Sequence, residues 1–339
     1  MEPPSRSRRV AIAYNSSDER ALNNDLDFIS ERAVKDEADG VFRALKAKDH
    51  QPFYFPIDDI HKQIPQLIDE NPEVIFNLCE GYRGNAGYEM FIAGVWELLG
   101  IPYTGNTPLT LGIAQNKVLT KRLLDSKRIP TPVYQVYRQV PDSTYLTYPL
   151  IAKPSREDAS LGITQDSVIL NLNQLKNRVQ QLLEKYRQPI LVEKLIEGRE
   201  FNVSILGNNP SRVLAISEIN FDTVEKNYHK ITSYEAKWLE DHPMYKNTPP
   251  VCPAKVNAEL KRKLEEAALM TYKLLGGRDY GRVDFRVDKS EHIYILEYNP
   301  NPDISPDAGY SNALRAAGML YENFIEFLIH QSLNRSEYD

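Results

Sequence analysis

The sequence predicts a mixed α/β protein in which a parallel-sheet domain precedes two subdomains built on antiparallel strands. In the first third, apolar strand segments alternate with helical segments, and this alternation is typical of βαβ units around a parallel sheet. From about residue 190 onward, strands follow one another without helices between them, which indicates antiparallel hairpins. The length of 339 residues suits two or three domains.

The N-terminal third begins with a buried strand at Arg9–Tyr14. Amphipathic periodicity then predicts helices, and short apolar runs predict strands. The last helix ends at Gly100, because glycine readily takes the left-handed conformation that closes a helix. The expected elements are a helix at about 31–48, a strand at 53–55, another helix, a strand at 74–78 and a helix at 89–99.

The middle of the chain is expected to start a new unit near Pro130 and Pro132. We predict a strand at 149–153, a charged helix at 173–186, and strands at 190–194, 200–206 and 212–220. We then predict that the polar segment 222–250 forms a long loop. A loop of that length inside a compact domain is usually functional or disordered.

The last third opens with a strong helix at 254–275, which Gly276 and Gly277 terminate. Two strands with alternating polarity follow at 281–287 and 293–298, and a final amphipathic helix is expected at 313–330. These elements predict a second sheet close to the C-terminus.

Charge and cysteine content exclude several classes of protein. The 41 Lys and Arg residues against 47 Asp and Glu give a net charge of −6, which argues against a broad nucleic-acid-binding surface. Two cysteines are too few for a disulfide scaffold or a four-cysteine zinc site. The apolar runs are too short for a secretory signal or a membrane span, so we expect a cytoplasmic protein without a membrane partner.

The strongest chemical pattern lies on the two strands of the last third. Side chains alternate along a strand, so Arg282 shares a face with Asp284, and Glu297 shares one with Asn299. If the two strands are hairpin neighbours, these four side chains meet. Two carboxylates and an amide oxygen are hard ligands suited to Mg²⁺ or Mn²⁺ held with nucleotide phosphates. The plain alternative is a half-exposed sheet whose charged residues face solvent.

Two further segments contribute weaker signals. Lys153 ends a buried strand and leads into a small polar loop that reaches Gly162, an arrangement suited to phosphate contact. Glu193 and Glu200 lie seven residues apart across a turn, which taken alone is most often a solvated hairpin.

Taken together, these segments resemble the ATP-grasp fold, and specifically the D-alanine–D-alanine ligase branch, over nearly the whole chain. The resemblance implies units at 1–130, 131–220 and 221–339, with 222–250 acting as a lid over the site. The matching segments are Ile101–Gly105, Lys153–Gly162, Tyr234–Lys237, Gly281–Asp284 and Leu296–Pro300.

The resemblance also implies roles for individual residues, with ATP and Mg²⁺ or Mn²⁺ bound between the subdomains. Asp284, Glu297 and Asn299 would hold the metal, and Arg282 would stabilise charge at the reacting carbon. The segment Glu193–Ile196 would line the adenine pocket, and Glu200 would bind the ribose. The expected ATP-binding residues are Lys117, Lys153, Ser160, Glu193, Lys194, Ile196, Glu200 and Lys237, the last reaching the γ-phosphate.

The departures from the family pattern fall on the substrate side. Arg83 stands near the place of a histidine of the family, and Asp303 and Ala308 stand where the family has glycine and a carboxylate-binding serine. Ala159 and Trp238 replace a serine and a tyrosine that are tied to each other, so both hydroxyls are missing. The expected substrate-binding residues are Arg83, Tyr234 and Asp303.

These departures favour an ATP-dependent ligase that joins an amino-acid amine to an acceptor other than D-alanine. The branch of mycosporine-glycine ligases, which attach an amino acid to a ring ketone, fits this description. A genuine D-alanine–D-alanine ligase and a non-catalytic ATP-binding regulator are the alternatives, and a structural protein is a third. The resemblance further implies a homodimer with small-molecule substrates and no nucleic-acid partner.

Overall fold

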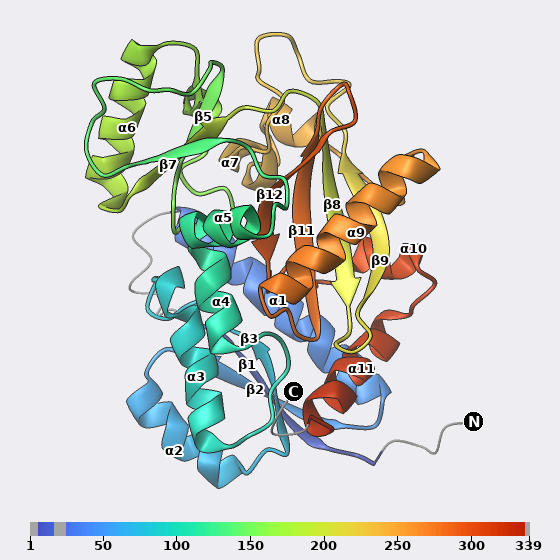
Figure 1. Cartoon of the computed structure of the whole chain (residues 1–339). Helices are drawn as coiled ribbons and strands as arrows, with labels where there is room; N and C mark the ends of the chain where they lie inside the picture. Colours follow the sequence, from blue (N-terminus) through green and yellow to red (C-terminus); the bar gives the residue numbers. More distant parts are fainter. Residues whose placement is uncertain (1–5, 17–24, 336–339) are drawn as a thin grey trace.

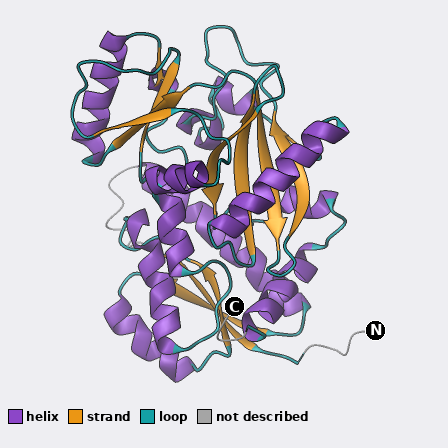
Figure 2. Ribbon diagram, in the orientation of Figure 1, coloured by secondary structure: helices purple, strands orange, loops and turns teal. Residues whose placement is uncertain are grey.

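The structure is a computed structural model that describes residues 6–16 and 25–335. Within these residues the strands form three sheets, one for each lobe seen in Figure 1, and helices pack on their faces (Figure 2). The mixed α/β class and the change from parallel to antiparallel strands are confirmed. No helix in the described ranges is long and apolar enough to cross a membrane.

The N-terminal sheet is parallel, with the strand order β2 (Gln51–Ile57), β1 (Arg9–Asn15), β3 (Val74–Leu78). The connecting helices are α1 (Asp25–Ala47) and α2 (Ile60–Glu70), and α3 (Glu89–Leu99) follows β3. Gly100 ends α3 in the left-handed conformation, with φ +66°, as the sequence predicts.

The central sheet is antiparallel and small, and its strand order is β4, β7, β5, β6. These strands are β4 (Tyr134–Tyr137), β5 (Leu150–Pro154), β6 (Val168–Ile169) and β7 (Ile190–Lys194). The sequence analysis did not predict β4 and β6. The amphipathic helix α6 (Leu172–Tyr186) buries Leu175, Val179 and Leu182 against the sheet. Two helices, α4 (Pro108–Gln115) and α5 (Lys117–Ser126), lead into this sheet from the N-terminal one.

The C-terminal sheet is antiparallel, in the order β10 (Pro250–Val251), β9 (Arg212–Ile219), β8 (Arg199–Leu206), β11 (Tyr280–Val287), β12 (Ile293–Asn299). It therefore includes β8 and β9, which the sequence analysis grouped with residues 131–220. Helix α9 (Ala258–Leu274) crosses one face of this sheet (Figure 1). It starts four residues later than predicted, because Asn257 caps it by accepting a hydrogen bond from the Leu260 N–H.

The polar segment 222–250 is more ordered than the loop that its composition predicts. It contains two short helices, α7 (Tyr234–Trp238) and α8 (Pro243–Lys246). A small apolar cluster holds the segment together, and its buried members are Phe221, Val224, Ala236 and Met244. Few apolar residues spaced far apart are enough to fix this segment, and no periodic pattern reveals them.

The predicted C-terminal helix at 313–330 is wrong, because two helices replace it. These are α10 (Gly309–Ala316) and α11 (Tyr321–Leu333), and between them Gly318 takes a left-handed φ of +74°. Helix α11 then packs beside α1, where Phe324 and Leu328 join a core that also contains Val41 and Leu45. The end of the chain therefore fastens the C-terminal sheet to the N-terminal domain.

Candidate active site

A cavity of about 1950 Å³ lies between the three sheets. Its walls come from the loop after β3, from β7 and the loop 158–163, from segment 222–250, and from β11 and β12. The predicted site residues that line it are Arg83, Lys153, Ser160, Glu193, Lys194, Ile196, Glu200, Tyr234, Lys237, Arg282, Asp284, Glu297, Asn299 and Asp303. The remaining one, Lys117, is buried beside the cavity with its ammonium 3.5 Å from Glu297 Oε2.

The β11–β12 hairpin has the register that the sequence pattern requires. Asp284 is paired with Glu297, and Arg282 with Asn299, across neighbouring strands. The Arg282 guanidinium donates to both oxygens of Asp284, with Nε–Oδ1 and Nη2–Oδ2 distances of 2.7 Å each. Asn202 Nδ2 on β8 donates to the same Oδ1 at 2.7 Å. The carboxylate is therefore fixed by β8 and β11 together.

Glu297 carries its charge in a strongly cationic surrounding. Burial works against ionisation, yet Lys117, Lys153, Arg282 and Lys237 outweigh it and hold the pKa of Glu297 at about 2. The neighbouring Lys117 responds in the opposite sense, because Asp158 and Glu297 raise its pKa in spite of burial. The cavity thus keeps both partners charged at neutral pH.

A second buried group of charges lies at the wall of the cavity that β5 and β7 form. Glu193 on β7 accepts from Lys153 Nζ at 2.7 Å and lies 2.8 Å from Lys121 Nζ, and all three side chains are at most 5% exposed. Burial opposes the charge on Glu193, but the two lysines lower the pKa of this carboxyl below its usual value. Lys121 was not among the predicted site residues, although it shares α5 with Lys117.

Glu200 is held by residues that the sequence analysis did not single out. Arg286 Nη2 lies 2.9 Å from Glu200 Oε2, and the Thr232 hydroxyl donates to Oε1 at 2.7 Å. Arg286 is two residues beyond Asp284 on β11, so it lies on the same face of the strand. That alternation was the signal that could have identified it.

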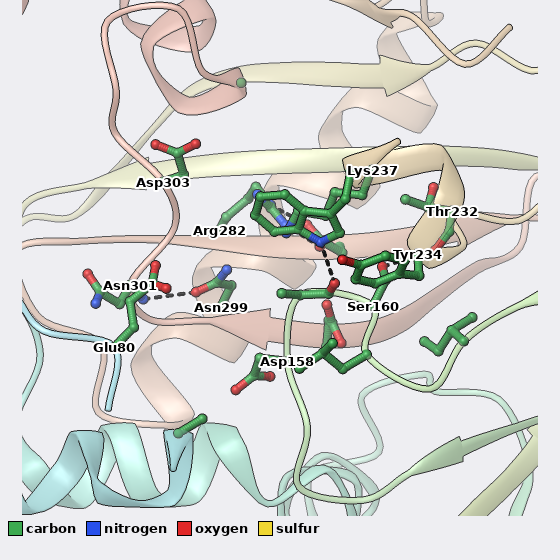
Figure 3. A pocket seen from close by; sticks show the side chains of 18 of the residues that line it. Glu80, Asp158, Ser160, Thr232, Tyr234, Lys237, Arg282, Asn299, Asn301 and Asp303 are labelled. Carbon is green, nitrogen blue, oxygen red and sulfur yellow. Dashed lines mark hydrogen bonds and ion pairs between the residues drawn. The ribbon is translucent and has the colours of Figure 1, made fainter. Parts of the chain in front are cut away.

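The segment 222–250 is fastened to the loop that follows β5. The Trp238 indole Nε1 donates to the Ala159 carbonyl oxygen at 2.9 Å, a contact drawn in Figure 3. The Ser160 hydroxyl donates to the Thr232 carbonyl at 3.1 Å, and the Tyr234 N–H donates to the Ile163 carbonyl at 2.8 Å. The two hydroxyls that the sequence lacks are therefore replaced by an indole N–H and a backbone oxygen, and the two loops remain joined.

Trp238 also stands next to the lysine that the sequence analysis assigns to the γ-phosphate. The Lys237 ammonium lies 5.1 Å from the centre of the Trp238 ring. Burial, followed by the charge of Arg282, lowers the pKa of Lys237, while nearby carboxylates act in the opposite direction. A desolvated ammonium of this kind binds an anion more strongly than one in water.

The substrate-side residues have a different character. Arg83 lies at the exposed tip of the loop after β3, where its guanidinium is 5.2 Å from the centre of the Tyr82 ring. Ala308 stands at the start of α10 without a side-chain cap, and Asp303 accepts a hydrogen bond from the Ser305 N–H at 2.8 Å. In Figure 3, Asp303 lies on the same side of the view as Glu80 and Asn301, away from Tyr234 and Ser160. Sequence analysis missed Glu80.

The donor set on β11 and β12 fits a divalent cation. Each carboxylate oxygen has two acceptor positions, so Asp284 Oδ2, which accepts from Arg282 Nη2 alone, keeps one available. Among the described residues no three His, Cys, Asp or Glu side chains gather into a metal site. A cation here would therefore use Asp284, Glu297, the Asn299 amide oxygen and the oxygens of a phosphate ligand.

Comparison with known proteins agrees with this architecture. A family model described as the D-ala D-ala ligase C-terminus matches residues 111–330. A crystal structure of the D-alanine–D-alanine ligase of Bacillus anthracis complexed with ATP superposes with a TM-score of 0.75 at 20% identity, covering 96% of this chain and 98% of that one. The fold and cavity define an ATP-grasp enzyme, an ATP-dependent ligase that forms C–N bonds.

The sequence relatives narrow this class to a family. The D-alanine–D-alanine ligase of Carboxydothermus hydrogenoformans is 31% identical over 88% of this chain and 94% of its own length. The y4sG protein of Sinorhizobium fredii, which is uncharacterized, is 33% identical over 78% of this chain and 76% of its own length. The chain belongs to the D-alanine–D-alanine ligase family.

The buried charges around β7 lead to a stability prediction. Replacing Glu193 with Gln leaves Lys121 and Lys153 buried without a counter-charge, so we expect the free energy of unfolding to fall by about 3–5 kcal/mol. Glu184→Gln, on the exposed face of α6, is the matched control and should change it by less than about 0.5 kcal/mol. Equilibrium urea unfolding measures both, and equal values for the two variants would contradict the assignment.

The contact between Trp238 and Ala159 leads to a kinetic prediction. Trp238→Phe keeps an aromatic side chain but removes the indole donor. One hydrogen bond of about 0.5–1.5 kcal/mol corresponds to a rise of about 2- to 12-fold in the KM for ATP. Trp96→Phe is the control, because it also removes an indole donor, 2.9 Å from Asn77 Oδ1, but inside the N-terminal domain. A KM for ATP that rises equally in both variants would show that the contact has no specific effect on ATP binding.

Proposed function

We propose that this protein uses ATP to phosphorylate an oxygen of a small acceptor and then joins an amino-acid amine to the activated carbon. Support for the nucleotide part comes from the four cations that converge on one end of the cavity, Lys117, Lys153, Lys237 and Arg282. Such cations stabilise charge on a transferring phosphoryl group, which is the main source of catalysis in this chemistry.

Each part of ATP has a proposed site in the cavity. Lys117 and Lys153 contact its phosphates together with Ser160, and Lys237 reaches the γ-phosphate. The segment Glu193–Ile196, including Lys194, lines the adenine pocket, while Glu200 accepts hydrogen bonds from the ribose. Segment 222–250 covers the site and keeps water from the activated intermediate.

The metal site proposed on β11 and β12 adds the remaining charge compensation. Asp284, Glu297 and Asn299 hold Mg²⁺ or Mn²⁺, which, when bound, polarises the phosphoryl oxygens as a Lewis acid. Arg282 already shares its charge with Asp284, so its guanidinium is preorganised near the reacting carbon and costs little reorganisation during the reaction.

The single observation that carries the substrate proposal is the replacement of a hydroxyl by carboxylates at the acceptor end. Ala308 offers no side-chain donor at the start of α10, and the cavity wall nearby contains Asp303 and Glu80. An acceptor that presents a carboxylate for activation would meet like charges there without the serine that binds it in the parent family. An acceptor that is activated at a ring ketone fits better, and mycosporine-glycine is our first candidate.

D-alanine–D-alanine ligation is the second candidate, because relatives of that name are 27–33% identical to this chain. A non-catalytic ATP-binding regulator is disfavoured by the complete set of charged residues around the cavity. A protein that only binds nucleotide has no reason to retain Arg282, Asp284 and Glu297 together. Each candidate predicts a different pattern of substrate-dependent ATP use.

Phosphate release tests the proposal. The purified protein with ATP and Mg²⁺ should release phosphate only when an amino acid and an acceptor such as mycosporine-glycine or a simpler aminocyclohexenone are both present. Release with D-alanine as the sole added substrate would instead establish the second candidate. ATP binding, seen as a rise in melting temperature, with no stimulation by any pair would contradict the ligase proposal.

The proposed metal ligands give a separate prediction. Glu297→Gln removes a charged ligand from the metal but preserves the size of the side chain, so turnover should fall by at least about 100-fold. The variant should still fold, because Asp158 remains as a counter-charge 3.0 Å from the Lys117 ammonium. Titration with Mg²⁺ should show that the variant needs a higher concentration for half-maximal activity. Unchanged turnover would exclude Glu297 as a ligand.

A further inference from the structure

Glu80 is a carboxylate that neither the family resemblance nor the sequence motifs single out. It follows β3 directly, at the carboxyl end of the parallel sheet, where loops open into the cavity. The side-chain amide of Asn15 fixes the backbone on both sides of it: Oδ1 accepts from the Glu80 N–H at 2.7 Å, and Nδ2 donates to the Gly81 carbonyl at 2.5 Å. The main chain of Glu80 is therefore held firmly at the cavity wall.

The turn beyond Glu80 is closed as well. Tyr82 and Asn85 exchange backbone hydrogen bonds of 3.1 Å each, and Arg83 and Gly84 between them have φ values of +50° and +71°. This tight turn carries Arg83 to the exposed tip, where its Nε lies 3.5 Å from the Asp58 carbonyl. Within this loop, Glu80 is thus the charged side chain nearest the end of the sheet.

The Glu80 carboxylate has no internal partner, since no hydrogen bond or ion pair joins it to any described residue. The neighbouring carboxylates are all engaged. Glu89 accepts from Asn301 Nδ2 at 3.1 Å, Glu37 accepts from the Ile304 N–H at 2.9 Å, and Asp303 accepts from the Ser305 N–H. An acceptor that is fixed at its backbone but unpaired at its carboxylate is available to a ligand.

The charges around Glu80 come from several elements. The charge of Lys237 on α7 favours the ionised form of Glu80, whereas the charges of Asp303 after β12 and Asp158 after β5 oppose it. Glu37 of α1 and Glu89 of α3 lie in the same acidic group. The Glu80 side chain is exposed to the cavity, but the protein that surrounds the cavity desolvates it. This desolvation is the largest influence, and together these effects raise the pKa of Glu80 to about 7. A carboxylate near neutrality is well suited to accept a proton at physiological pH.

We propose that Glu80 binds the ammonium group of the incoming amino acid and accepts its proton, so that a free amine attacks the activated carbon. This inference rests on the proposed function above. One N–H proton passes to Glu80 Oε, and the nitrogen lone pair then forms the C–N bond. The C–O bond to the phosphoryl group breaks, and phosphate leaves with the bonding electrons. The departing phosphate takes up the second N–H proton, so one hydrogen remains on the nitrogen with either kind of acceptor.

The position of Glu80 explains why this base lies apart from the phosphate-binding cations. In Figure 3 it lies on the same side of the view as Asp303 and Asn301, and Arg282 lies between this side and Lys237 and Tyr234. An ammonium is attracted to the acidic side, and the γ-phosphate to the cations. The two reactants are therefore directed to adjacent places without competing for the same side chains.

The test compares Glu80→Gln with the wild-type protein, using the amino acid and acceptor that support wild-type phosphate release. Hydroxylamine, which is largely unprotonated at pH 7, serves as a second nucleophile that needs no base. We expect Glu80→Gln to lose amino-acid-dependent release by about 100-fold or more at pH 7. Release with hydroxylamine and the KM for ATP should stay within about twofold of the wild-type values. Glu184→Gln is the control for the loss of one charge.

The pH profile separates a base from a structural role. Wild-type kcat/KM for the amino acid should rise from pH 6 to pH 8, as Glu80 becomes ionised near pH 7, and then level off. In Glu80→Gln the rate should keep rising about tenfold per pH unit, because only the amine that is already deprotonated reacts. Glu80→Asp should retain more activity than Glu80→Gln.

Three outcomes would overturn the inference. Amino-acid-dependent release by Glu80→Gln within threefold of wild type would show that no base acts there. Loss of the hydroxylamine reaction to the same extent would place the defect in phosphorylation or folding. Wild-type protein that releases no phosphate with any pair would overturn the proposed function itself, and that result is visible before the variant is examined.

Discussion

The packing of the central sheet against the C-terminal sheet depends on several buried cations that lie close together and must stay charged. Lys117, Lys121 and Lys153 are each at most 5% exposed, and an ammonium in such a position is costly unless a carboxylate compensates it. Glu193 supplies that compensation for two of them, and Asp158 and Glu297 supply it for the third, Lys117. These contacts join α5, β5, β7 and β12, so the same charges that would receive ATP also hold the central sheet against the C-terminal one. Substrate binding and domain packing are consequently coupled.

Segment 222–250 shows that a contact can persist when the side chains that the family pattern would place there are absent. Ala159 and Trp238 remove two hydroxyls, yet the indole N–H reaches the backbone oxygen of Ala159. This contact depends on backbone geometry, because Ala159 and Ser160 have left-handed φ values of +53° and +62° that direct their peptide groups toward segment 222–250. The cost of two non-glycine residues in this conformation is offset by the hydrogen bonds that the turn makes possible. Segment 222–250 therefore stays joined to the loop after β5 although both hydroxyls are missing.

The sequence predicts the part of the site that follows from local periodicity. Arg282, Asp284, Glu297 and Asn299 could be placed on one sheet face because side chains alternate, and the observed register joins them as expected. The partners of Glu193 could not be predicted in the same way, since Lys121 is far from it in sequence and only the packing of α5 brings them together. In the loop after β3, Arg83 was predicted to bind substrate because it stands near the place of a family histidine. The tight turn carries that residue outward and leaves Glu80 at the end of the strand. Turn geometry and ion pairs between distant residues are therefore the features that the sequence alone does not predict.

The distribution of charge within the cavity bears on the order of events in the reaction. Cations gathered at one end stabilise phosphoryl transfer, but the same cations would also repel an ammonium that arrived among them. The carboxylates Glu80 and Asp303 create a second region of opposite sign, in which Lys237 acts on Glu80 without forming an ion pair with it. If the two side chains met directly, each would satisfy the other and neither would be free for a reactant. Keeping them apart leaves room for the reactants themselves to complete the charge balance, an amine at the acidic side and a phosphoryl group at the basic one. The overall charge of −6 conceals this internal polarity, which is the property that makes the cavity suited to joining an amine to a phosphorylated acceptor.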